Sequence, residues 1–383
     1  MRSHDGQASA DYAAVLAVVA AVLALVGGIA VPGVGEQVVE AVRTGICIVG
    51  GDVCRDADAA AAGLAPCVTS ERAEGMETTV DVAFLRVGED DRWSVAIRSD
   101  GSAVVTRTEG RQLGATAGAG ATGTPIQLDV GVSGTIAIVR RSARSWEFPD
   151  LRAARRFLAE VLGPDPGAID RHPPDERWQA LGERADASVG MSAPLLGSAG
   201  GRAALEGAIG RRAGGGRTTW FFRSELDDPQ AYASLPTWSS SGPGREALVE
   251  FTTDRAGARE VLVRTASATP DRREEVTATL DLRDPEISAA LEAALPAPLG
   301  GGGSPWPPTV IRKVAELAAT RGTVERRVHV IDDRSRTFSL SARLMAKALG
   351  LEHTRVDVRS RLADATVWIA GSGPRRRVDC LGS

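Results

Sequence analysis

The chain has 383 residues, of which 25% are charged and 43% hydrophobic, and its net charge is -4. This length suits more than one domain, or one large β-rich domain with additions. Neither a strongly basic surface nor an acidic tail is indicated, so no nucleic-acid partner is expected. Asparagine is absent and nearly all basic residues are arginine, which indicates a strongly GC-biased genome, such as that of an actinobacterium, and lowers the weight of any arginine cluster.

The first predicted element is a helix long enough to cross a bilayer. Residues 12–31 form an apolar run without charge, and twenty helical residues span roughly 30 Å. Arg2 precedes this run, whereas Glu36 and Glu40 follow it, so the positive-inside tendency places the bulk of the chain outside. A secretory signal peptide cleaved after Ala30 is the alternative, although acidic residues precede the run and it is long for such a peptide.

A short polar leader ending in Gly6 stands before Gln7 and the apolar helix. This order resembles type IV pilin-like proteins, particularly tight-adherence pilins and TadE-like pseudopilins. The resemblance implies that a prepilin peptidase cuts between Gly6 and Gln7 and leaves the helix in place among other pilin-like subunits. It also implies that Asp11, where the family usually has Glu, neutralises the new amine of a neighbouring subunit. The alternative for Asp11 is a place in the headgroup region, where a carboxylate favours the helix N-terminus.

Four cysteines follow the membrane helix. Cys47, Cys54 and Cys67 cluster after a predicted stalk, and Cys380 lies near the end of the chain. An even number of cysteines outside a membrane indicates disulfides, and four allow three pairings. Two glycines make a small Cys47–Cys54 loop easy to close, which leaves Cys67 with Cys380. Zinc is the alternative, but the spacing lacks the short Cys-x2-4-Cys knuckle of structural zinc sites.

From about residue 78 the hydrophobic period changes from helical to two, which predicts strands. Asp100-Gly101 lies between two alternating runs and predicts a tight hairpin. Asp150 and Asp284-Pro285 are helix-start signals, so helices are expected near 150–162 and 285–295. The pattern favours an antiparallel meander with a few packing helices.

The predicted fold class is α+β, an N-terminal transmembrane helix followed by an ectodomain dominated by antiparallel sheet. A run of four glycines marks a linker, and the part after it reads as αβαβ with a helix through Leu344 to Ala348. The predicted segments are a leader (1–6), a transmembrane helix (7–31), a stalk with cysteines (32–70), a β-rich ectodomain (71–295), a linker (296–308) and the αβαβ part (309–383).

No nucleophile elbow, Walker loop or His-Glu-x-x-His motif is found, and the Gly-x-Gly-x-x-Gly string at 118–123 leads into a strand pattern instead of the helix that dinucleotide binding needs. Neither an enzyme nor a cofactor is therefore expected. The predicted function is that of a single-pass, outward-facing protein of the cell membrane, a structural or adhesive component of a tight-adherence-type envelope system. The lipid bilayer is its expected partner, with prepilin peptidase and pilin-like subunits. The alternatives are an envelope hydrolase that uses unrecognised carboxylates and a soluble effector released by signal peptidase.

Overall fold

A computed structural model describes residues 47, 51–82, 85–118, 133–165, 167–187, 191–193, 197–199, 203–226, 244–294, 308–344 and 347–381. The predicted leader and transmembrane helix, with Gly6, Gln7 and Asp11, lie outside these residues, as does nearly all of the predicted linker. Within the described ranges no helix is long and apolar enough to span a membrane.

The chain divides into two units, and the smaller comprises the segment up to Ala65 together with Arg375–Asp379. Its described part holds the short helix α3 (Asp56–Ala61) and a Cys47–Cys54 disulfide. Arg377 is fully buried, donates to the Ala65 carbonyl oxygen at 3.1 Å and pairs with Asp379 at 2.8 Å. A hydrogen-bonded ion pair therefore occupies the interior of this small unit.

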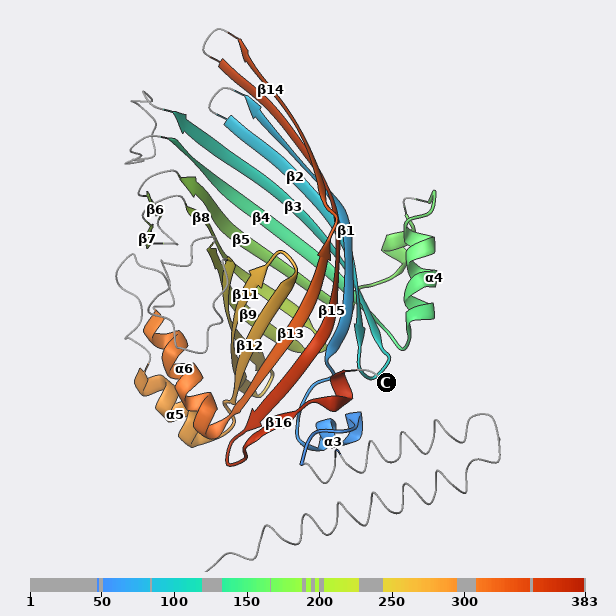
Figure 1. Cartoon of the computed structure of the whole chain (residues 1–383), viewed down its shortest axis with the longest axis vertical. Helices are drawn as coiled ribbons and strands as arrows, with labels where there is room; N and C mark the ends of the chain where they lie inside the picture. The colour runs from blue at the N-terminus through green and yellow to red at the C-terminus, as the bar shows by residue number, and fades with distance from the viewer. Residues whose placement is uncertain are drawn as a thin grey trace, which may run out of the picture. The chain divides into compact units, whose positions relative to one another are not determined.

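The larger unit is an antiparallel sheet in which each strand pairs with the next, and twelve of its described strands close into a barrel (Figure 1). These strands are β1 (Val68–Val82), β2 (Leu85–Arg98), β3 (Ala103–Gly118), β4 (Ser133–Phe148), β5 (Glu176–Ala187), β8 (Ala203–Gly214), β9 (Arg217–Leu226), β10 (Gly244–Asp254), β11 (Gly257–Thr269), β12 (Arg272–Asp281), β13 (Thr323–Asp333) and β15 (Lys347–Ile369). The remaining described strands are β14 (Arg336–Leu344), which pairs with β15, β16 (Pro374–Arg376), and the separate pair β6 (Met191–Ala193) and β7 (Gly197–Ala199).

The barrel closes where its first strand meets its last. Residues of β1 from Ser70 to Val82 pair with β15 over Leu349–Arg361. We start at Trp368 on β15 and move from each residue to its direct partner on the next strand. One circuit of the barrel ends at His353, which is also on β15, so the two ends of the circuit differ by 15 residues (368 − 353). Such a stagger means that the strands tilt relative to the barrel axis, as closure of a sheet requires.

Three helices pack on the outer face of the barrel wall (Figure 1). Helix α4 (Leu151–Val161) covers the ends of β3 and β4, where Phe157 lies against Trp146 with ring centroids 5.0 Å apart. Helices α5 (Pro285–Ala294) and α6 (Pro308–Arg321) cover β11, β12 and β13, and they bury Val261 and Leu280. The apolar cores of the larger unit thus lie largely between the wall and these helices.

The local signals found in the sequence act as expected. The Asp100-Gly101 hairpin joins β2 to β3, and Gly101 has φ +84°, which glycine adopts without strain. The Asp150 side chain caps α4 by accepting a hydrogen bond from the Ala153 amide at 2.7 Å. These two predictions are confirmed.

Two structural predictions are wrong. The fold class is not α+β, because the described body is a closed β-barrel with a few short helices on it. The helix predicted through Leu344 to Ala348 is instead the junction of β14 and β15, whose described residues are strand on both sides. Leu, Ala and Lys favour helices, but β14 pairs with β15, and β15 also pairs with β1. These pairings hold both strands extended.

Candidate functional site in the barrel lumen

The strand alternation gives the wall two chemically different faces. The face against which the helices pack is the outer one, because it also carries the exposed aliphatic side chains of the uncovered strands. The opposite face lines the lumen, and it combines small residues with charged ones. On β10, for example, Glu246 and Glu250 point inward with Leu248 between them, whereas Ala247 and Val249 point outward under the helices.

A cavity of about 310 Å³ lies against the lumen wall. We call it the lumen chamber, and its lining comes from inner-face positions of β4, β5 and β8 to β11. Because charged residues line this part of the lumen, the sheet encloses a polar compartment and not an apolar core. The lining residues are Arg141, Trp178, Ala180, Ala208, Arg212, Phe221, Arg223, Glu246, Leu248, Glu250 and Arg264.

Ion pairs between different strands line the chamber. Arg212 donates to Glu250 at 3.2 Å, and Arg223 lies 3.0 Å from Glu246. Glu246 also accepts from Arg273 of β12 at 2.8 Å. Partners on other strands restrain these side chains, and a binding compartment needs side chains in defined positions.

A second cavity, of about 770 Å³, borders the lumen chamber. The two share Trp178 and Arg212 as lining residues. The second cavity is lined at the ends of β3, β4, β5, β8 and β9, where the turn residue Gly215 also contributes. It therefore lies beside the lumen chamber at one end of the barrel, and we call it the mouth cavity.

The outer face carries a second feature, which we call the apolar stripe. It consists of five aliphatic residues on five adjacent strands, each a direct partner of the next and each 37 to 59% exposed. Exposed aliphatic side chains occur singly on most proteins, but a contiguous set marks a contact surface. The residues are Leu351, Val80, Val87, Leu113 and Ile138.

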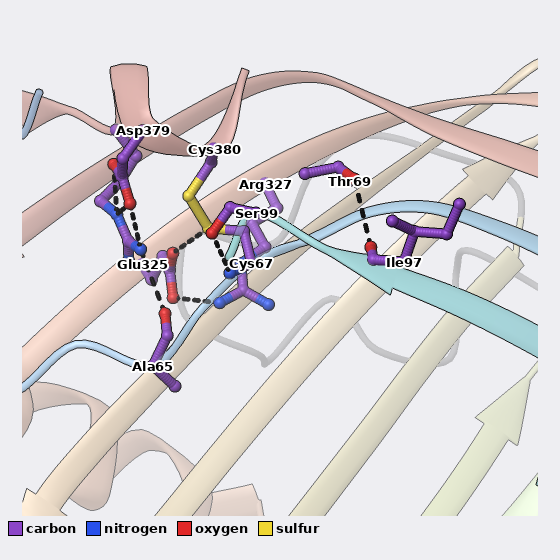
Figure 2. Close-up of a disulfide and its surroundings, with 10 residues drawn as sticks. Ala65, Cys67, Thr69, Ile97, Ser99, Glu325, Arg327, Asp379 and Cys380 are labelled. Atoms are coloured by element: carbon purple, nitrogen blue, oxygen red, sulfur yellow. Dashed lines mark hydrogen bonds and ion pairs between the residues drawn. A yellow bond between two sulfur atoms is a disulfide. The ribbon is translucent and has the colours of Figure 1, made fainter. Parts of the chain in front are cut away.

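The structure pairs Cys67 with Cys380, while the remaining two cysteines pair in the smaller unit. Around the first disulfide, Glu325 lies 3.6 Å from the Cys67 sulfur and accepts from Arg327 at 2.6 Å (Figure 2). These three groups, Cys67, Glu325 and Cys380, are close enough to hold a metal ion. The sulfurs are bonded to each other, however, so the thiolates that zinc takes as ligands are not formed here.

The sequence reasoning missed the lumen. Period-two alternation identifies two faces of a strand, but it does not show which face points inward once the sheet closes. On β10 to β12, charged residues face inward, among them Glu246, Arg264 and Arg273. A signal was present in the sequence, because Glu246 and Glu250 share one face of β10, and Arg273 and Glu275 share one face of β12.

Comparisons with known proteins give no family for this chain. No protein-family model matches the sequence, and no curated protein sequence matches it. Among solved structures, a mutant of the Rh. blastica porin is 9% identical, with 75% of this chain and 98% of the porin covered and a TM-score of 0.18. A TodX monoaromatic hydrocarbon channel mutant is 10% identical, with 79% and 92% covered and a TM-score of 0.14. The outer membrane protease OmpT from Escherichia coli is 8% identical, with 78% and 99% covered and a TM-score of 0.10. Similarities this low decide neither the strand path nor the function.

The predicted function and localisation are wrong. The body expected to extend outside from a single helix is itself a closed barrel with apolar side chains exposed on its wall. A pilin-like structural or adhesive role, held at the membrane by one helix, does not describe such a body. Prepilin peptidase and pilin-like subunits gain no support as partners, and the lipid bilayer as a partner stays a prediction. The absence of enzymatic activity stays a prediction.

Proposed function

We propose that this protein is a β-barrel membrane protein that contacts lipid through the apolar stripe and encloses a polar compartment for small solutes. The observation that carries the proposal is the stripe itself, five exposed aliphatic residues paired directly across five strands. Outward apolar and inward polar residues in alternation are the arrangement of barrels that lie in lipid.

Closure of the sheet suits this environment. A strand edge in lipid leaves backbone amides and carbonyls without partners, so only closed barrels and helices are stable there. The β1 and β15 pairing supplies partners along the junction, and the stripe runs across it through Val80 and Leu351. Each side chain of the stripe gains on the order of 1 kcal/mol when its exposed part leaves water.

Charged pairs mark the limit of the apolar layer. Glu89 and Arg111 are direct partners on the outer face, one outward position from Val87 and Leu113, and their side chains lie 3.3 Å apart. Charged side chains are costly in hydrocarbon but favourable at the headgroups. The proposed bilayer therefore meets the wall at the stripe, and its headgroups lie at the Glu89–Arg111 level.

The experiment measures association with lipid vesicles by flotation. Leu113→Glu with Ile138→Glu places two carboxylates in the stripe, where charge is unfavourable in lipid. We expect the vesicle-bound fraction of this variant to fall at least about tenfold below that of the unaltered protein, since roughly 1.4 kcal/mol corresponds to a factor of ten.

The matched control is Gln179→Glu, which adds a carboxylate at an exposed outer position outside the stripe. Its vesicle-bound fraction should stay at the level of the unaltered protein. Circular dichroism should show the same strand content in all three proteins. Equal binding by the stripe variant and the control would overturn the bilayer contact.

A further inference from the structure

The charges of the lumen chamber do not balance. Its lining holds four arginines and two glutamates. Both carboxylates are already engaged, Glu250 by Arg212 and Glu246 by Arg223. Glu246 is shared further with Arg273, which is not part of the lining. The chamber therefore has more guanidinium groups than its own carboxylates can satisfy.

Arg264 is where this excess is concentrated. Arg141, the other arginine of the lining, has Asp90 at 3.6 Å. Within the described ranges no acceptor lies within hydrogen-bonding or ion-pair distance of Arg264, and its Nε is buried without a partner. Glu275 acts on it only electrostatically and pairs with Arg273 at 2.8 Å. A buried donor without an acceptor costs roughly 1 to 3 kcal/mol, which a bound anion would recover.

The rest of the lining is apolar and aromatic. Trp178 and Phe221 meet edge to face, with ring centroids 5.9 Å apart. Leu248 is the direct partner of Arg264 on the adjacent strand, so an aliphatic surface lies beside the guanidinium. Ala180 and Ala208 leave room in front of the rings because their side chains are short. A compartment of this kind accommodates a compact apolar body with one charged end.

We infer that the lumen chamber binds a small organic carboxylate, with its carboxylate on Arg264 and its apolar body against Trp178, Phe221 and Leu248. Arginine presents a planar fork that matches a carboxylate with two parallel hydrogen bonds. The inference deepens the proposed function, since it names the class of solute that the polar compartment takes. The mouth cavity provides the path, because it shares Trp178 and Arg212 with the chamber.

The test is an isothermal calorimetric titration of the detergent-solubilised full chain with sodium benzoate. We expect saturable binding at one site, and Arg264→Gln should weaken it at least about tenfold, since the pair with a charged ligand is lost. Arg264→Lys keeps the charge without the fork and should bind with intermediate affinity. Benzyl alcohol, which has the same ring but no charge, and inorganic phosphate, which has charge but no ring, should both bind more weakly than benzoate.

The matched control is Arg211→Gln, on the strand position next to Arg212. Arg211 lies on the outer face over the Trp220 ring, 5.6 Å from its centroid, so the same substitution removes a charge outside the lumen. Its benzoate affinity should equal that of the unaltered protein. Equal affinities for Arg264→Gln and the unaltered protein, or no saturable benzoate binding at all, would overturn the inference. Because no vesicle is present, this result is independent of the bilayer experiment.

Discussion

Two parts of the outer wall have the same strand pattern and different surroundings. On β10 to β13 the outward residues Val249, Val261 and Leu280 are at most 1% exposed, because α5 and α6 lie on them. On β15 and β1 to β4 the outward residues of the apolar stripe are 37 to 59% exposed, with no described element over them. The pattern of a strand shows that a face is apolar, whereas the chain around it determines what covers that face.

The difference has a thermodynamic side. The helix-covered face stabilises the fold of the isolated chain, since its apolar area leaves water on folding. The apolar stripe contributes little to that stability, because its side chains remain in water until something else covers them. Stability and surface association should therefore respond to substitutions in different parts of the same wall.

The largest expected effect comes from removing the Cys67–Cys380 disulfide, whose cysteines are 313 residues apart in sequence. Its removal should affect the two regions of the wall differently. A cross-link over so long a loop stabilises by about 6 kcal/mol on the chain-entropy model. Cys67→Ser with Cys380→Ser should lower the free energy of unfolding by about this amount. It should also loosen the junction of β1 and β15, which the stripe crosses, before it affects the helix-covered face.

Hydrogen exchange with mass spectrometry, together with urea unfolding, measures this effect. Peptides from β1 and β15 should lose protection in the double variant, whereas peptides from β11 and β12 should keep theirs. Cys47→Ser with Cys54→Ser removes the short disulfide of the smaller unit and serves as the control. Uniform loss of protection over the whole barrel would contradict a separable junction.

A smaller effect compares the two regions directly. Leu280→Ala removes a fully buried side chain under the helices and should cost about 2 to 5 kcal/mol in urea unfolding. Leu113→Ala removes the same atoms from a side chain that is 59% exposed, and it should cost less than about 0.5 kcal/mol. Similar losses at the two positions would mean that the stripe is also covered in solution.

The smallest expected effect concerns helix α4, which covers the ends of β3 and β4. Hydrogen bonds from Arg171, and then from His172, lower the pKa of Glu160 below its usual value of 4.5. A lowered carboxyl pKa contributes stability at pH values above the ordinary pKa, and this contribution is lost as the pH falls through the lowered value. Acidification below about pH 4.5 should therefore loosen the link between α4 and the Arg171 segment.

Near-ultraviolet circular dichroism follows this step, because Trp93 and Trp146 stack beside α4 with ring centroids 6.1 Å apart. Glu160→Gln lacks the ionisable group and should show no acid transition of this kind. A transition of the same size in the variant would assign the acid sensitivity to other groups.

The sequence revealed the local elements of the fold but not its closure. Asp150 and Asp100-Gly101 act within a few residues, so their helix and hairpin followed from local chemistry. The pairing of Val80 with Leu351 joins strands more than 250 residues apart, and nothing in either strand identifies its partner. Without that pairing the face of Arg264 could not be recognised as a lumen, because the direction inward exists only after the sheet has closed.

The same long disulfide makes residues 67 to 380 a covalent ring that contains all twelve strands of the barrel wall. A single cut in any loop between these cysteines opens the ring without separating it into two molecules. A protease that reaches one turn at a mouth of the barrel would then leave a nicked protein of unchanged mass, apart from one added water. Only reduction would release the fragments, so electrophoresis with and without reductant distinguishes an intact chain from a nicked one.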